Sequence, residues 1–163
     1  MRKIFFILSI CIFINPVYAK QDNAISNLMQ GLTTPTCINL MKKLEDEQIP
    51  ENLELRTIPN LDRETKIFSA FTVVNYNGQD SHISTTAIPN GDNKCSILYN
   101  ESYSFAGPCI IAREQAFSKW KFLGKLVETL AFSFKRDKEL FGFLTQQGNN
   151  RTCLIQKRKT YTN

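Results

Sequence analysis

The side chains that could carry out catalysis are few and lie apart in this sequence. His82 is the single histidine, and it stands in a polar turn before a predicted strand. Its neighbour Ser81 would point to the opposite face of that strand. Nucleophilic catalysis needs a base within hydrogen-bond reach of the nucleophile, and no G-x-S-x-G motif occurs. We therefore predict no catalytic residue and interpret His82 as a surface-loop residue.

Paired carboxylates are the other source of chemistry, since glycoside hydrolysis uses two converging carboxyl groups. Asp62 with Glu64, and Asp137 with Glu139, lie in turn-like stretches among basic residues. Exposed turn charge is the simpler interpretation of both pairs. No phosphate-binding loop occurs, and the cysteine spacing does not suit a metal site. The sequence therefore predicts no cofactor and no metal.

Two charged clusters are the candidates for binding a partner. Alternation along a strand would place Lys157 and Lys159 on one face and Arg158 on the other. The acidic cluster stands near a helix C-terminus, where carboxylates are slightly unfavourable. The alternatives are a solvated helix end for the acids, and lysines that protect a sheet edge for the bases. The predicted binding residues are Lys157, Arg158, Lys159, Glu45, Asp46 and Glu47.

Charge is distributed unevenly along the chain. Residues 20–105 contain 7 basic and 11 acidic side chains, whereas residues 106–163 contain 11 basic and 4 acidic ones. The first part is therefore net negative and the second strongly positive. Such asymmetry suits an acidic partner or an anionic polymer. It is equally compatible with two halves of one domain that neutralise each other.

The N-terminus has the pattern of a secretory signal peptide. Arg2 and Lys3 precede an apolar run of eleven residues, 4–14, and small residues follow at positions 17 and 19. We predict that residues 1–19 are cleaved after Ala19 and that the protein is periplasmic or secreted. The apolar run is shorter than the roughly 20 residues that span a bilayer. No later stretch is apolar enough for a membrane span in the mature chain.

Four cysteines remain in the predicted mature chain, and an even count in an exported protein indicates two disulfides. Free buried thiols are the alternative. An internal repeat favours Cys37–Cys95 and Cys109–Cys153 among the three possible pairings. A simple up-and-down strand path opposes this choice, because it would place Cys109 and Cys153 at opposite ends of the sheet.

The hydrophobic pattern predicts helices first and strands afterwards. An apolar stripe at Cys37, Leu40, Met41 and Leu44 predicts a helix after Thr34. A second main helix is predicted from Pro108, with Phe117 and Trp120 on its apolar side and Gly124 at its end. A short helix is also predicted within 22–31. Strands are predicted at 53–58, 66–75, 81–88, 94–104, 125–134, 139–146 and 151–161.

Two similar segments predict an internal repeat. Gly91-Asp92-Asn93 precedes Cys95, and Gly148-Asn149-Asn150 precedes Cys153. We interpret the chain from residue 20 to 163 as one domain with α-β-β-β pseudo-repeats at about 34–105 and 106–163. The alternative is two ordinary hairpin turns that resemble each other by chance. The predicted fold class is a two-layer α+β domain: an antiparallel sheet of about six strands with two main helices on one face.

These observations favour an exported, non-enzymatic binding protein. We expect a bacterial periplasmic inhibitor or immunity-type protein that recognises another protein of the cell envelope, such as a toxin or hydrolase. The expectation rests on compartment, size and the absence of a catalytic motif. The alternatives are a small secreted enzyme or toxin that uses carboxylates, and a binder of an envelope polymer. Export argues against nucleic acid, and the oligomeric state is left open.

Overall fold

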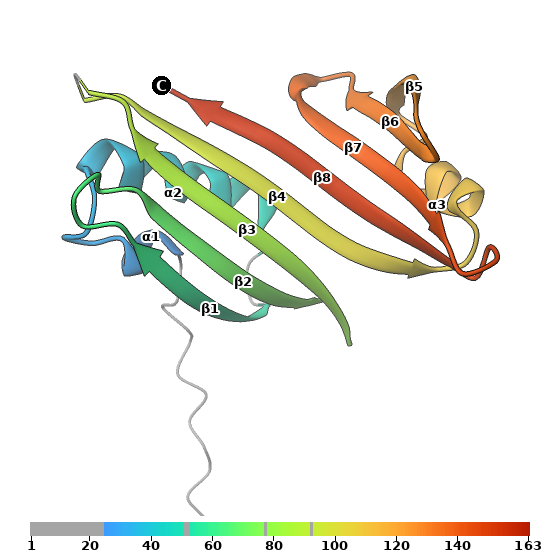
Figure 1. Ribbon diagram of the computed structural model, residues 1–163, viewed down its shortest axis with the longest axis horizontal. Helices are drawn as coiled ribbons and strands as arrows, with labels where there is room; N and C mark the ends of the chain where they lie inside the picture. The colour runs from blue at the N-terminus through green and yellow to red at the C-terminus, as the bar shows by residue number, and fades with distance from the viewer. Residues whose placement is uncertain (1–24, 51–52, 77, 92) are drawn as a thin grey trace, which may run out of the picture.

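The protein is described by a computed structural model that covers residues 25–50, 53–76, 78–91 and 93–163. The predicted signal peptide lies outside these residues. The described chain forms one antiparallel sheet of eight strands and three short helices (Figure 1). The helices are α1 (Ile25–Leu28), α2 (Pro35–Gln48) and α3 (Cys109–Ala116). The strands are β1 (Glu54–Leu61), β2 (Phe68–Tyr76), β3 (Gln79–Pro89), β4 (Cys95–Ala106), β5 (Trp120–Leu126), β6 (Thr129–Phe134), β7 (Asp137–Gln147) and β8 (Thr152–Thr162).

The predicted fold class is wrong. The chain is mostly β, with eight strands in one sheet, rather than a two-layer α+β domain with about six strands built from α-β-β-β units. The clearest error is β5, whose first residue, Trp120, was assigned to a helix. Helix α3 ends at Ala116, and the Trp120 amide donates to the Phe117 carbonyl in a turn. Phe117 and Trp120 are three residues apart, which matches the spacing of an apolar stripe on a helix. Here, however, they lie in a turn and at the start of a strand.

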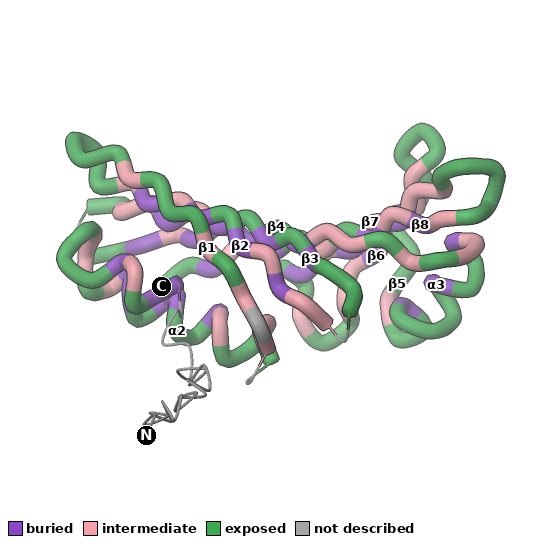
Figure 2. Tube along the Cα trace, turned by 90° about the horizontal axis from the view of Figure 1, so that it is seen from below, coloured by how far each residue is buried: buried purple, intermediate pink, exposed green. Residues whose placement is uncertain are grey.

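Strand order divides the sheet into two halves that meet at β4 and β8. The order is β1-β2-β3-β4-β8-β7-β6-β5. In chain order, α2 is followed by the four strands of the N-terminal half, and α3 by the four strands of the C-terminal half. Both helices lie on the same face of the sheet, near its two ends (Figure 2). We call the other side of the sheet the helix-free face.

The N-terminal half contains the larger apolar core. Thr34 caps α2 by accepting a hydrogen bond from the Cys37 amide at 3.4 Å, and Pro35 occupies the first helical position. This helix was predicted correctly. Alternate residues of β2, including Phe68 and Val74, are buried against it. The N-terminal core therefore joins a helical stripe to one face of the sheet.

A smaller core lies in the C-terminal half. It contains seven buried residues, Cys109, Ala112, Phe117, Phe132, Leu144, Cys153 and Ile155. The Phe117 ring packs directly on the backbone of β7 at Gly142, where a Cβ atom would collide with the ring. Glycine at this position therefore lets an aromatic ring take the place of a side chain.

Both predicted disulfides, Cys37–Cys95 and Cys109–Cys153, are present. The objection from an up-and-down path fails because β8 returns beside β4, with Phe105 opposite Cys153. The end of β4 and the start of β8 therefore lie together, and α3 begins there. Two disulfides fit an oxidising compartment outside the cytoplasm.

Candidate binding groove on the helix-free face

A groove of about 470 Å³ crosses the middle of the sheet and draws on both halves. Its residues come from β2, β3 and β4 on one side and from β6, β7 and β8 on the other. It is lined by Phe71, His82, Ser84, Asn100, Glu101, Ser102, Thr129, Phe143, Gln156, Lys157 and Arg158.

The polar part of the groove follows from the alternation of side chains along each strand. In β3, Ser81 and Ile83 are buried on the helix side, so His82 and Ser84 lie on the helix-free face. Strand register then continues the polar strip across the sheet. The directly opposed pairs are His82 with Ser102, Ser84 with Asn100, Ser102 with Gln156, and Asn100 with Arg158.

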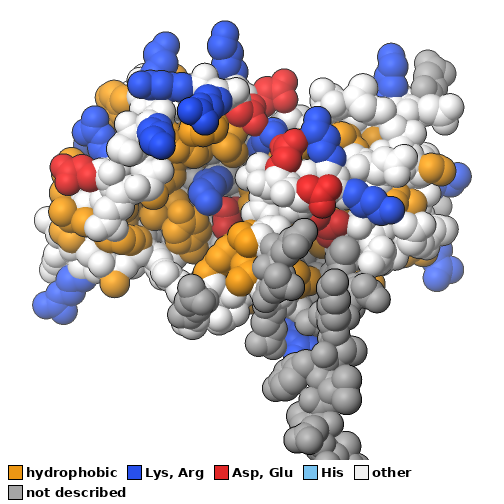
Figure 3. Space-filling model, turned by 180° about the vertical axis from the view of Figure 1, so that it is seen from behind, with side chains coloured by type: hydrophobic (Ala, Val, Ile, Leu, Met, Phe, Trp, Pro, Cys, Tyr) orange, Lys and Arg blue, Asp and Glu red, His pale blue; other side chains and the backbone are white. Residues whose placement is uncertain are grey.

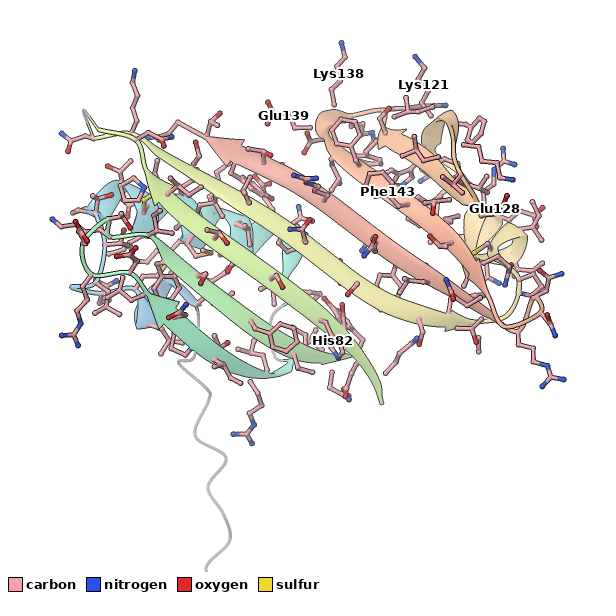
Figure 4. The ribbon with its side chains drawn as sticks, in the orientation of Figure 1. His82, Lys121, Glu128, Lys138, Glu139 and Phe143 are labelled. Atoms are coloured by element: carbon pink, nitrogen blue, oxygen red, sulfur yellow. A yellow bond between two sulfur atoms is a disulfide. The ribbon has the colours of Figure 1, made fainter. Side chains whose placement is uncertain are left out.

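Two phenylalanines flank this polar strip. Phe71 of β2 is 42% exposed, and its ring centre lies 5.5 Å from that of His82. Phe143 of β7 stands opposite Gln156. Figure 4 shows His82 and Phe143 on opposite sides of the β4–β8 pair. The groove thus offers aromatic surface on both sides of hydroxyl and amide groups.

Arg158 supplies the positive charge of the groove. The side chain is exposed, and within the described residues no carboxylate forms an ion pair with it. A guanidinium group presents its donors in a planar fork that matches a carboxylate. The predicted placement of Arg158 on the face opposite Lys157 and Lys159 is confirmed by its position in the strip.

Lys157 also lines the groove, but its ammonium group is engaged on the helix side. Lys157 Nζ lies 3.0 Å from Glu101 Oε2, and the Glu101 side chain is only 4% exposed. Ser81 and Tyr99 also donate to this carboxylate, at 2.9 and 3.1 Å. Burial alone would lower the pKa of Lys157, but the Glu101 charge outweighs it and raises the pKa. Lys157 therefore neutralises a buried acid between the two cores.

Lys159 joins the two predicted clusters to each other. Its Nζ atom lies 2.8 Å from Glu47 Oε2 at the end of α2 and 2.7 Å from Asp137 Oδ2 at the start of β7. The Tyr161 hydroxyl donates to Glu47 at 3.0 Å. Partial burial would raise the pKa of both carboxyl groups, but the hydrogen bonds from Lys159 lower it. Lys159 and Glu47 thus link the two halves.

The remaining acids lie away from the groove. Glu45 accepts hydrogen bonds from the Ser26 amide at 3.3 and 3.4 Å, which ties α1 to α2. Burial raises the pKa of Glu45. Asp46 is exposed. Of the six predicted binding residues, Arg158 alone combines a place in the groove with an unpaired side chain.

Sequence reasoning missed most of the groove. His82 was interpreted as a loop residue and lies within β3, and neither Phe71 nor Phe143 was predicted as a site residue. The available signal was the alternation of polar residues, as in His82, Ser84, Asn100 and Ser102. This pattern marks one face of a sheet but does not show that six strands contribute to one groove.

The groove is equipped for binding more clearly than for acid–base catalysis. The one carboxylate among its lining residues is Glu101, which already has three partners. The described residues contain no cluster of three metal-ligating side chains.

No helix in this part of the chain is long and apolar enough to cross a membrane. No family model, curated protein or solved structure matches this chain.

Proposed function

We propose that this is an exported, non-enzymatic binding protein that recognises another protein through the groove on its helix-free face. The observation that carries the proposal is the Arg158 guanidinium, which has no carboxylate partner among the described residues and lies in a strip of amides and hydroxyls between two phenylalanines. Arginine and aromatic residues dominate the binding energy of many protein interfaces. The partner segment would bring a carboxylate to Arg158 and apolar side chains to Phe71 and Phe143.

The supporting structure for this groove is rigid. Its polar side chains stand on paired strands, so little conformational freedom is lost when a partner binds. Serine and asparagine side chains can adapt their hydrogen bonds to a polypeptide backbone. An inhibitor or immunity-type role in the periplasm suits these properties, with a toxin or hydrolase as partner. The two disulfides support the compartment.

Two other functions make different demands on the groove. An enzyme that uses paired carboxylates would require a second acid beside Glu101 on the same face. A binder of an envelope polymer would use the phenylalanines and amides to hold sugar rings. The polymer alternative shares the lining residues with our proposal, so the experiment must separate the two ligands.

The experiment is retention of envelope components on the immobilised, oxidised protein. We expect the wild type to retain a protein partner and Arg158→Glu to lose it, because a carboxylate would repel the partner's acid. Arg151→Glu is the matched control, since Arg151 is exposed in the turn before β8. Phe143→Ala should weaken binding by about 2 kcal/mol, the usual size of a central interface residue.

Three results decide between the functions. Loss of a protein partner in Arg158→Glu, with retention in Arg151→Glu, supports the proposal. Equal retention by both charge variants places binding elsewhere on the molecule. Retention of a sugar polymer in place of protein, abolished by Phe143→Ala, establishes the polymer-binding alternative.

A further inference from the structure

A second surface, beside the groove, carries six exposed apolar side chains. It lies on α3 and the β5–β6 hairpin at the end of the C-terminal half (Figures 1 and 2). Orange side chains gather over this end of the molecule in Figure 3. Its members, which we call the hairpin patch, are Ile110, Ile111, Phe122, Leu123, Leu126 and Val127.

Val127 at the tip of the hairpin combines two unfavourable features. The side chain is 90% exposed, and its backbone φ is +54°. A β-branched residue in this left-handed region is a conformational outlier, whereas asparagine or glycine adopts it readily. Such strain persists where a function requires the residue. A ligand that buries the valine side chain would supply that requirement.

The apolar side chains project from both faces of the hairpin. A β-bulge shifts the register of β5 between Phe122 and Gly124. Phe122 contacts Phe132 on the helix side, whereas Leu126 stands opposite Thr129 on the helix-free side. The hairpin end is therefore a wedge with apolar residues around its free edge. A narrow apolar edge of this kind suits insertion among lipid acyl chains better than contact with a flat protein surface.

Basic residues surround the hairpin patch. Arg113, Lys119, Lys121 and Lys125 are all exposed, against the two acids Glu114 and Glu128. Lys125 forms an ion pair with Glu128, in which Nζ lies 2.8 Å from Oε2. Figure 4 shows Lys121 and Glu128 at opposite ends of the hairpin. Lysines beside an apolar wedge can place their ammonium groups among anionic headgroups while their stems follow the apolar surface.

We propose that the hairpin patch docks this protein on an anionic lipid surface, with Leu126 and Val127 inserted and the flanking lysines at headgroup level. Apolar contact and electrostatic attraction together are what peripheral membrane attachment requires. Self-association through the same patch is disfavoured, because it would bring two net-positive surfaces together. The hairpin patch shares no residue with the groove, although Leu126 stands opposite the groove residue Thr129.

The test is co-sedimentation of the exported, oxidised protein with vesicles of phosphatidylcholine, with and without phosphatidylglycerol. We expect binding to the anionic vesicles that weakens as salt rises. Val127→Asn should reduce it about tenfold, because it removes one inserted side chain while asparagine suits the left-handed backbone. Lys125→Gln should reduce it about fivefold, because it removes the lysine next to the inserted residues. Ile58→Asn is the matched control, since Ile58 is 71% exposed on the opposite edge strand β1.

Each outcome decides the proposal. Weaker binding by Val127→Asn, with Ile58→Asn unchanged, supports it. No binding of wild type to anionic vesicles overturns it, and so does equal loss in the two variants. Sedimentation velocity without lipid tests the competing occupant, a second copy of the chain. A wild-type dimer that Val127→Asn converts to a monomer would assign the hairpin patch to self-association and overturn lipid docking.

Discussion

The two halves of the sheet share an order of elements but differ in how well their helices cover them. In the N-terminal half, α2 spans 14 residues and buries five of them. In the C-terminal half, α3 spans 8 residues and buries two, Cys109 and Ala112. Helix α3 makes its main contacts with β7 and β8, so Phe122 of β5 stays 49% exposed on the helix side. The same arrangement thus provides a stable core in one half and an accessible apolar surface in the other.

Besides the backbone ladder between β4 and β8, charged side chains rather than a continuous apolar core join the two halves. Glu101 and Lys157 stand directly opposite each other in the central strand pair, between the two clusters of buried residues. Lys159 contacts Glu47 of the N-terminal half and Asp137 of the C-terminal half. Together with the β4–β8 ladder, these contacts fix the relative position of the strands that form the groove, and they occupy three of the six predicted binding residues.

The largest effect is expected at the central ion pair. Lys157→Met leaves the Glu101 carboxylate buried without its cation and should lower the free energy of unfolding by about 3–5 kcal/mol. The double variant Glu101→Gln with Lys157→Met removes both charges and should recover most of that loss. Urea unfolding measures both. Equal losses in the single and double variants would show that the two halves do not depend on this pair.

The difference in helix cover predicts unequal effects of truncating helical side chains. Leu44→Ala in α2 removes a fully buried side chain and should cost about 2–5 kcal/mol, including the cavity that it leaves. Ile111→Ala in α3 removes a side chain that is 39% exposed and should cost less, about 1 kcal/mol. Thermal or urea unfolding compares them. Similar losses would mean that α3 is covered by something else.

Part of this comparison was predictable from the sequence and part was not. The α2 stripe and its Thr34 cap are local signals, and the repeated turn before each last cysteine indicated the correct disulfides. Trp120 was misassigned because aromatic residues three apart suit a helix and a turn equally well. The groove depends on β8 pairing with β4, and periodicity within a strand carries no information about such distant partners. Lys159 and Glu47 meet for the same reason.

Acid pH should expose the contribution of Lys159. The pKa values of Glu47 and Asp137 are lowered in the folded protein, so their ion pairs stabilise it above the ordinary carboxyl pKa. This stabilisation is lost as the pH falls through the lowered values. At pH 7 we expect Lys159→Met to cost about 1–2 kcal/mol, a moderate value because Glu47 is partly exposed. The difference from wild type should shrink below about pH 4.

Urea unfolding of both proteins between pH 7 and pH 3 measures this change. Glu45, whose pKa is raised, shifts stability in the opposite sense, but it is present in both proteins and cancels from their difference. A difference that stays constant over this range would assign the loss to packing of the Lys159 stem rather than to its charge.

A small effect on stability, of the opposite sign, is expected at the hairpin tip. Val127→Asn relieves a left-handed backbone conformation and should stabilise the fold by about 0.5–1 kcal/mol. Ile58→Asn, on the opposite edge strand, should not stabilise it. The melting temperatures of both variants measure this. A destabilised Val127→Asn protein would show that the tip valine makes an intramolecular contribution.

Photo-crosslinking from the groove tests the central claim most directly. A benzoyl-phenylalanine at position 143 places the reactive group beside the polar strip, and the same residue at position 94 places it in the exposed turn before β4. We predict a protein adduct in the cell envelope from position 143 alone, abolished by Arg158→Glu. Adducts of equal yield from both positions, or an adduct that survives Arg158→Glu, would contradict recognition through the groove.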